Sequence, residues 1–167
     1  LARQLGTALA SAGYTVLTGG GPGIMEAATR GAQEGGGLSV GCNILLPHEQ
    51  FPNDYLESSD EFDHFIVRKV MLHKYTSAFI FMPGGFGTLD VMFETITLIQ
   101  TGNMVRFPLV AMGQDYWDAL LVFVQKRMLK EKTINEGEVA VFGTDSPAEA
   151  VAHIDNVVRD PSANEAL

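Results

Sequence analysis

Apolar residues fall into two kinds of segment that alternate along the whole chain. Short continuous apolar runs, typical of strands buried in a sheet, span residues 14–18, 38–46, 78–82, 107–112 and 139–142. Between these runs apolar positions recur at helical spacing, which predicts helices over 1–12, 24–34, 62–75, 89–100, 116–129 and from 147 onward. This alternation predicts an α/β fold of three layers, a mostly parallel sheet with helices on both faces. Because the pattern opens on a helix, we expect a further strand before Leu1.

Two glycine-rich segments each follow a predicted strand and precede a predicted helix. The first is Gly19-Gly20-Gly21-Pro22-Gly23 and the second is Pro83-Gly84-Gly85-Phe86-Gly87-Thr88. Glycine lets the backbone approach a ligand closely, and the first N–H groups of a helix attract anions. The first loop fits neither the G-x-G-x-x-G pattern of dinucleotide sites nor the P-loop, which needs Lys-Ser/Thr. We interpret the pair as a phosphate site at the carboxyl ends of parallel strands.

Two polar segments offer further ligand contacts. Residues 47–55 contain two prolines and an Asn-Asp pair, which predicts an irregular loop. In that loop His48 and Glu49 either contact a ligand or are ordinary surface residues. The pair Arg68-Lys69 interrupts the apolar helix 62–75 and is either a solvated stripe or a contact to an anionic substrate. Because this helix ends just before the strand that leads to the second glycine loop, we favour the ligand role.

Composition restricts the partners and the compartment. The formal net charge of −9 argues against nucleic acid or an anionic membrane surface, since both require a basic protein surface. A single cysteine, Cys42, excludes an internal disulfide, and we interpret it as a small buried hydrophobic residue. No apolar run approaches the roughly 20 residues of a membrane helix, and no signal peptide is visible. The histidines show no metal-ligand spacing. The sequence predicts a cytoplasmic protein without a bound metal.

In their order and spacing, the two glycine loops and Arg68-Lys69 resemble the LONELY GUY family, often labelled "possible lysine decarboxylase". The resemblance runs from Leu1 to about Val158 and includes the Leu-Pro-His-Glu-Gln and Leu-Ile-Gln-Thr-Gly segments of its longer bacterial branch. It implies one Rossmann-like nucleotide-binding domain over residues 1–158, followed by a loose tail over 159–167.

The resemblance also implies an activity. The family is a homodimeric hydrolase that cleaves the N-glycosidic bond of adenine-type nucleoside 5′-monophosphates, cytokinin nucleotides among them, without a cofactor. The products are the free base and ribose 5-phosphate. Arg68 matches a catalytic arginine of the family, and the phosphate is expected on the second glycine loop with help from the first. The implied substrate-binding residues are Gly20, Gly21, Met25, Lys69, Gly84, Gly85, Gly87 and Thr88.

The sequence departs from the family at Val91. The family motif P-G-G-x-G-T-x-x-E ends in a catalytic glutamate at this position. In glycoside cleavage a carboxylate stabilises an oxocarbenium-like transition state and activates water, and valine can do neither. Asp90 and Glu94 are the candidate replacements for this catalytic role. We favour Glu94, because residues three apart share a helix face.

Three functions therefore remain open from the sequence. The first is the nucleotide hydrolase, the second is a nucleoside-monophosphate-binding protein that lost turnover with the glutamate, and the third is a dimeric scaffold with structural glycine turns. Lysine decarboxylation carries little weight, because it ordinarily needs pyridoxal phosphate on a Schiff-base lysine. Neither Lys69 nor Lys74 lies in such a context. The apolar surfaces of helices 62–75 and 89–100 predict a dimer interface.

Overall fold

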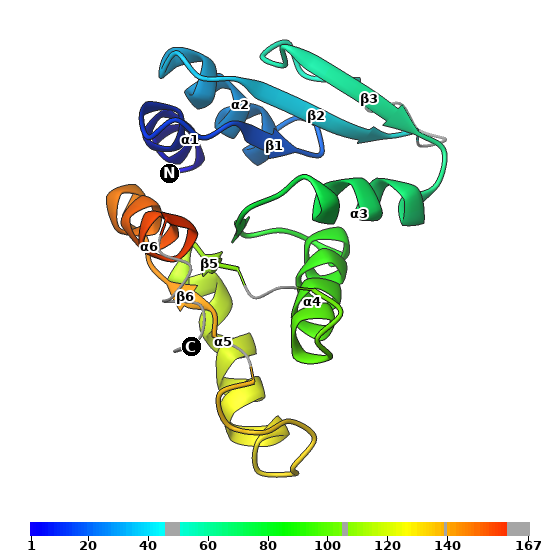
Figure 1. Ribbon diagram of the computed structural model, residues 1–167, viewed down its shortest axis with the longest axis vertical. Coiled ribbons are helices and arrows are strands. Elements are labelled where there is room, and N and C mark those ends of the chain that lie inside the picture. The colour runs from blue at the N-terminus through cyan, green and yellow to red at the C-terminus, as the bar shows by residue number, and fades with distance from the viewer. Residues whose placement is uncertain (46–50, 105–106, 139, 160–167) are drawn as a thin grey trace. The chain divides into compact units, whose positions relative to one another are not determined.

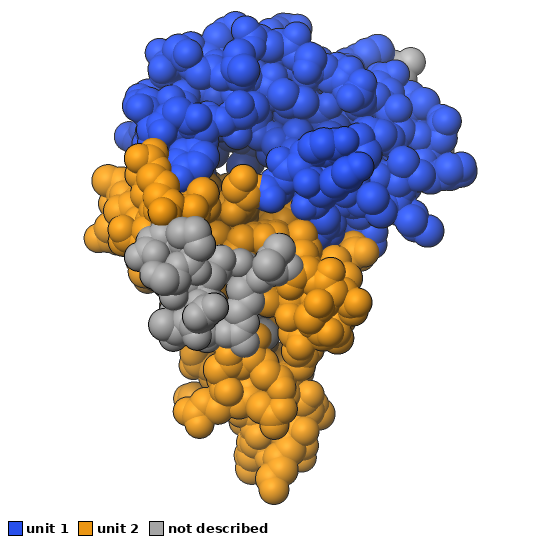
Figure 2. All heavy atoms as spheres, in the orientation of Figure 1, with its two compact units in different colours: residues 1–76 blue, residues 77–167 orange. Residues whose placement is uncertain are grey.

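The protein has an α/β fold with parallel strands, as the sequence predicts (Figure 1). The computed structural model describes residues 1–45, 51–104, 107–138 and 140–159, so that His48 and Glu49 lie outside the described residues. The chain divides into two compact units, Leu1–Thr76 and Ser77–Leu167, which Figure 2 distinguishes by colour. Within the described ranges, no helix combines the length and the apolar character needed to cross a bilayer.

The first unit is built on a three-stranded parallel sheet in the order β1-β2-β3. Its elements are α1 (Ala2–Ser11), β1 (Val16–Thr18), α2 (Ile24–Glu34), β2 (Ser39–Ile44), β3 (Ser58–Phe62) and α3 (Phe65–Lys74). Helices α1 and α2 pack against each other and against β1, whereas α3 packs against β2 and β3. The buried cluster of Ala10, Val16 and Ala32 joins the two helices to the sheet.

The second unit contains another three-stranded parallel sheet, in the order β4-β5-β6. Its elements are β4 (Phe79–Phe81), α4 (Phe86–Gln100), β5 (Leu109–Ala111), α5 (Gln114–Phe123), the π-helical segment η1 (Val124–Met128), β6 (Phe142–Gly143) and α6 (Pro147–Arg159). Its core joins Phe81, Met92, Leu109, Ala111 and Trp117. The Trp117 indole donates a hydrogen bond to the Met112 carbonyl at 3.0 Å, so the largest buried side chain has its polar group satisfied.

Some predicted boundaries match the observed ones and others differ. Helix α2 matches its prediction, and α6 begins at Pro147 as predicted. The Ser146 hydroxyl accepts the Glu149 N–H at 3.3 Å and so caps the start of α6. Helix α4 begins at Phe86, inside the second glycine segment, rather than at residue 89. Arg159, which the sequence assigned to the tail, is the last residue of α6, and residues 160–167 lie outside the described part.

Strand β3 is an element that the sequence pattern did not predict. Residues 58–61 are all exposed, and they read Ser-Ser-Asp-Glu, so no apolar alternation marks them. The strand exists because it pairs in parallel with β2, from Val40 opposite Ser58 to Ile44 opposite Phe62. A polar strand at the end of a sheet is consistent with charged residues that discourage pairing with further chains.

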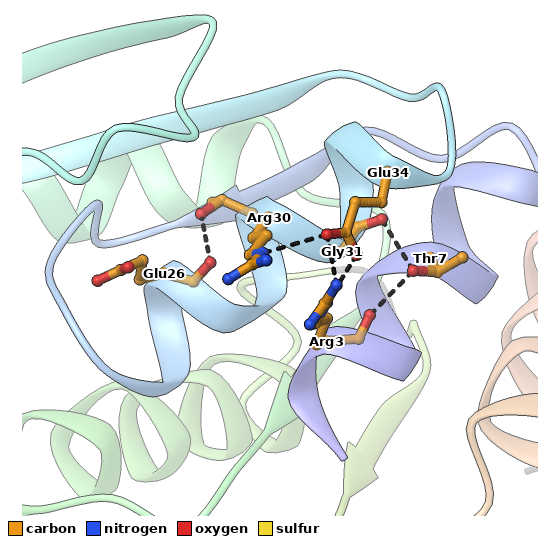
Figure 3. Close-up of polar contacts among 7 residues, drawn as sticks. Arg3, Thr7, Glu26, Arg30, Gly31 and Glu34 are labelled. Carbon is orange, nitrogen blue, oxygen red and sulfur yellow. Dashed lines mark hydrogen bonds and ion pairs between the residues drawn. The ribbon is translucent and has the colours of Figure 1, made fainter.

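Helices α1 and α2 approach so closely that two glycines are required where they meet (Figure 3). A Cβ atom on Gly31 would lie 2.0 Å from the Arg3 carbonyl oxygen, and one on Gly6 would lie 2.1 Å from the Ala28 carbonyl oxygen. The Thr7 hydroxyl donates to the Gly31 carbonyl at 3.0 Å across the contact. At the edge of the contact, Arg3 and Glu34 form two hydrogen bonds of 2.6 Å.

We predict that Gly31→Ala destabilises the protein, because the new methyl group meets backbone atoms rather than a side chain that can move. The expected loss is about 1–3 kcal/mol in the free energy of unfolding, measured by urea denaturation. Gly143→Ala is the control, since a Cβ atom there meets open space. A Gly31→Ala midpoint equal to that of the control would contradict the close contact.

Candidate functional site

The first glycine loop joins β1 to α2 through backbone conformations that favour glycine. Gly20 and Gly23 both have φ of +74°, and Gly23 is the residue that precedes the first turn of α2. There is also no room for a side chain at Gly20, since a Cβ atom there would lie 1.7 Å from Asn43 Oδ1. Its N–H donates to the Thr18 hydroxyl at 3.0 Å. The loop is therefore fixed in shape by its neighbours within the first unit.

Asn53 forms the main polar support of this loop. Its side-chain Nδ2 donates to the carbonyl oxygens of Gly20 at 3.0 Å and Gly21 at 3.1 Å, and its backbone N–H also donates to Gly20 at 2.9 Å. Its Oδ1 accepts hydrogen bonds from the Thr29 hydroxyl at 2.9 Å and from the Tyr55 N–H at 3.1 Å. No pattern in the sequence singles out Asn53 as a site residue. The one signal was its place in an irregular loop between Pro52 and Asp54.

Arg68 and Met25 lie against Gly19 at the start of the same loop. A Cβ atom on Gly19 would lie 2.2 Å from Arg68 Nη2 and 2.9 Å from Met25 Sδ. The structure thus brings together two of the predicted site residues, although they lie on α3 and α2. Gly19 permits this approach because it has no side chain.

The guanidinium of Arg68 is half-buried and oriented by the end of β2. Its Nε donates to the Cys42 carbonyl oxygen at 2.8 Å, and its remaining N–H groups make no hydrogen bond to any described residue. Burial lowers the pKa of Arg68, but a guanidinium remains protonated in proteins. Burial also raises the pKa of the neighbouring Cys42 thiol. The site therefore offers a fixed positive charge beside a thiol that favours its neutral form.

Lys69 follows Arg68 on α3, but the two side chains point in different directions, since adjacent residues lie on different faces of a helix. Its carbonyl contacts the His73 ring nitrogen Nδ1 at 2.7 Å, one turn further along the helix. Its predicted role in substrate binding stays a prediction.

The second glycine loop lies in the second unit, between β4 and α4. Gly85 precedes the first turn of α4, which Phe86 and Gly87 open. The N–H groups of Thr88 and Leu89 both donate to the Gly85 carbonyl, at 3.0 and 3.2 Å. The N–H groups that open a helix have no acceptor within it and carry the positive end of its dipole. The loop thus has the features of an anion site.

Two contacts fix Gly84 within this loop. The Tyr116 hydroxyl donates to its carbonyl oxygen at 2.5 Å, and a Cβ atom on Gly84 would lie 2.2 Å from Thr88 Oγ1. Gly84 and Thr88, both predicted to bind substrate, are therefore in direct contact. Tyr116 is a supporting residue that the sequence analysis assigned only to a helix. Phe86, between the glycines, is 91% exposed.

The residues near the missing glutamate lie on different sides of α4. Val91 is half-buried and packs against the core of the second unit. Asp90 is exposed, whereas Glu94 is half-buried with its Oε2 atom covered. Of the two candidate carboxylates, Glu94 is the more enclosed by protein. Across the described residues, no three His, Cys, Asp or Glu side chains gather into a possible metal site.

Comparison with known proteins identifies relatives of the whole chain. A rice protein (Oryza sativa), named a probable cytokinin riboside 5′-monophosphate phosphoribohydrolase, is 32% identical over 98% of this chain and 61% of its own length. The chain spans 70% and 53% of the length of two further curated relatives, from Arabidopsis thaliana and Mycobacterium tuberculosis.

Solved structures share the fold. The X-ray structure of a structural-genomics target superposes with a TM-score of 0.70 at 25% identity, over 93% of this chain and 85% of the other. A molybdenum cofactor binding protein from Rippkaea orientalis superposes with a TM-score of 0.66 at 24% identity, over 94% and 85% of the two chains. These likenesses confirm the Rossmann-like architecture predicted from the sequence.

A family model described as "Possible lysine decarboxylase" matches residues 25–154, a range that contains Met25, Arg68 and the whole second glycine loop. The chain therefore belongs to the LONELY GUY or "Possible lysine decarboxylase" family, and its relatives include proteins named cytokinin riboside 5′-monophosphate phosphoribohydrolases.

Proposed function

We propose that the protein hydrolyses the N-glycosidic bond of adenine-type nucleoside 5′-monophosphates, cytokinin nucleotides among them, to the free base and ribose 5-phosphate. The observation that carries the proposal is Arg68, held by the Cys42 carbonyl beside the first glycine loop with N–H donors left over. The names of the relatives support the same reaction. Residues 1–158 act as one nucleotide-binding domain in this proposal.

Phosphate binding in this proposal relies on backbone N–H groups. The second loop supplies them at the start of α4, through Gly85 and Gly87, while Gly84 and Thr88 shape the loop. Gly20, Gly21 and Lys69 assist at the phosphate, and Met25 borders the base and ribose. The proposal includes no cofactor, in keeping with the family resemblance of the sequence.

The chemical step needs a carboxylate in addition to Arg68. Water attacks C1′ as the bond from C1′ to the base nitrogen breaks, and the departing base takes up a proton. A carboxylate stabilises the positive charge that develops on the ribose ring and accepts the proton of the attacking water. Glu94 takes this role in our proposal, with Asp90 as the substitute. Arg68 stabilises negative charge on the phosphate or the leaving base.

A second function is favoured by one specific observation, the valine at position 91. Val91 packs against apolar core residues, and it supplies no charge or proton acceptor. The alternative is therefore a protein that binds a nucleoside monophosphate with weak or no turnover. The name of one fold neighbour makes the molybdenum cofactor a second probe for this alternative.

We predict that the purified chain releases base from AMP and from isopentenyladenosine monophosphate, detected by chromatography. Arg68→Ala should lower the rate by about 10²-fold or more, because it removes a charge aimed at the reacting region. Arg127→Ala, on η1, is the control and should match the parent. Nucleotide binding without base release would favour the binding protein, and absence of both would contradict the proposed site.

We predict that Val91→Glu separates the two functions. If Glu94 or Asp90 already serves as the carboxylate, the rate should rise only modestly. If catalysis was lost with the glutamate, it should rise by about 10²–10⁴-fold, the usual contribution of general base catalysis. Val91→Gln is the control, because glutamine has the size of glutamate without its charge. An increase in the glutamine variant equal to that in the glutamate variant would exclude a carboxylate effect.

We also propose that the protein forms a homodimer through the exposed apolar face of α3. Ile66 is 74% exposed and Val70 is 56% exposed, which is unusual for neighbouring apolar residues of one helix. Covering such a face with a second copy removes it from water.

We predict that size-exclusion chromatography with light scattering gives the mass of a dimer at micromolar concentration. Ile66→Asp should shift the mass to that of a monomer, because a charge would be buried at the interface. Val122→Asp introduces the same charge at an exposed position of α5 and should leave the dimer intact. A monomeric parent chain would reject the dimer.

A further inference from the structure

The side-chain amide of Asn53 can adopt only one orientation. The Tyr55 N–H is a donor, so the atom that it contacts at 3.1 Å must be the acceptor Oδ1. The carbonyls of Gly20 and Gly21 are acceptors, so the atom that contacts them at 3.0 and 3.1 Å must be the donor Nδ2. Exchanging the two atoms would place a donor against the Tyr55 N–H and an acceptor against both glycine carbonyls.

This orientation determines which backbone groups the first glycine loop can present. In a trans peptide the carbonyl and the N–H point in opposite directions. Because the Gly20 carbonyl turns toward Asn53, the N–H of Gly21 turns away from it. The next peptide joins Gly21 to Pro22 and has no N–H, so its only polar group is the Gly21 carbonyl. Asn53 holds that carbonyl as well and keeps it from any anion at the loop.

Besides the orientation of the loop, the Gly21 N–H itself indicates a ligand. Gly21 is buried, and no described residue accepts a hydrogen bond from its N–H. Buried backbone donors without an acceptor are rare in folded proteins. The Gly21 N–H points to the side of the loop that faces away from Asn53. An anionic oxygen of a ligand is the partner that this donor fits.

We propose that Asn53 is a positioning residue of the first glycine loop. It orients the peptide between Gly20 and Gly21 so that the Gly21 N–H donates to a phosphate oxygen of the ligand, and it withdraws the two carbonyls that would repel that oxygen. The inference rests on the proposed function, since it takes a phosphorylated nucleoside as the ligand. Asn53 itself does not contact the ligand.

The test compares Asn53→Asp with Thr29→Val by isothermal titration with adenosine and with AMP, the latter as its carbocyclic analogue, which has no N-glycosidic bond to hydrolyse. Asn53→Asp keeps the size and shape of the side chain but places a carboxylate oxygen against the two carbonyls. The side chain then repels both carbonyls, and only the backbone N–H of residue 53 still holds that of Gly20. We expect AMP to bind about tenfold more weakly or worse, and adenosine within about twofold of the parent. Thr29→Val removes a partner of Oδ1 but leaves both Nδ2 bonds, and should bind AMP within about threefold of the parent.

Two titration results overturn the inference. One is an Asn53→Asp protein that binds AMP as tightly as the parent, and the other is an equal loss for AMP and adenosine, which indicates general damage to the fold. A parent chain that binds neither ligand contradicts the proposed function instead. In that case amide hydrogen exchange of the ligand-free proteins decides whether Asn53 orients the loop. Faster exchange at Gly20, whose N–H is hydrogen-bonded to Thr18, in Asn53→Asp supports the inference, and unchanged exchange overturns it.

Discussion

The candidate site depends on backbone that comes closer to other groups than any side chain would allow. Gly19 lies against the Arg68 guanidinium, Gly20 against the Asn43 amide and Gly84 against the Thr88 hydroxyl, each at a distance that a Cβ atom would occupy. The same constraint operates where α1 meets α2. Glycine is therefore used here for close approach as much as for unusual dihedral angles, and each of these contacts lies within one of the two compact units.

The correct predictions come mostly from local patterns of apolar residues and glycines. The apolar spacing of α2 gives its observed bounds, and the glycine segments lie between strand and helix as expected. Strand β3 was not predicted, because its residues are polar and its existence depends on pairing with β2. Helix α4 starts at Phe86, earlier than predicted, because the Gly85 carbonyl accepts the Thr88 and Leu89 N–H groups and closes the first turn within the glycine segment. These errors arise where tertiary contacts outweigh local propensity.

The site shows the same division between local and long-range information. Arg68 and Met25 were predicted from a family resemblance, and the structure places both against Gly19. Asn53 was missed because its role depends on hydrogen bonds to carbonyls 33 and 32 residues away, which no spacing rule detects. Tyr116 was missed for the same reason, since its hydroxyl reaches the Gly84 carbonyl, 32 residues away, from α5. Supporting residues are therefore harder to predict than the loops that they support.

The position of Cys42 has a practical consequence. It is the only cysteine of the chain, it lies in the buried strand β2, and its own carbonyl holds Arg68. A thiol that is covered and kept in its neutral form reacts slowly with alkylating reagents, because the thiolate is the nucleophile. The rate of alkylation of the native protein therefore measures how often the first unit opens around Arg68. The protein thus contains a natural chemical reporter of its own local unfolding, without any label having to be introduced.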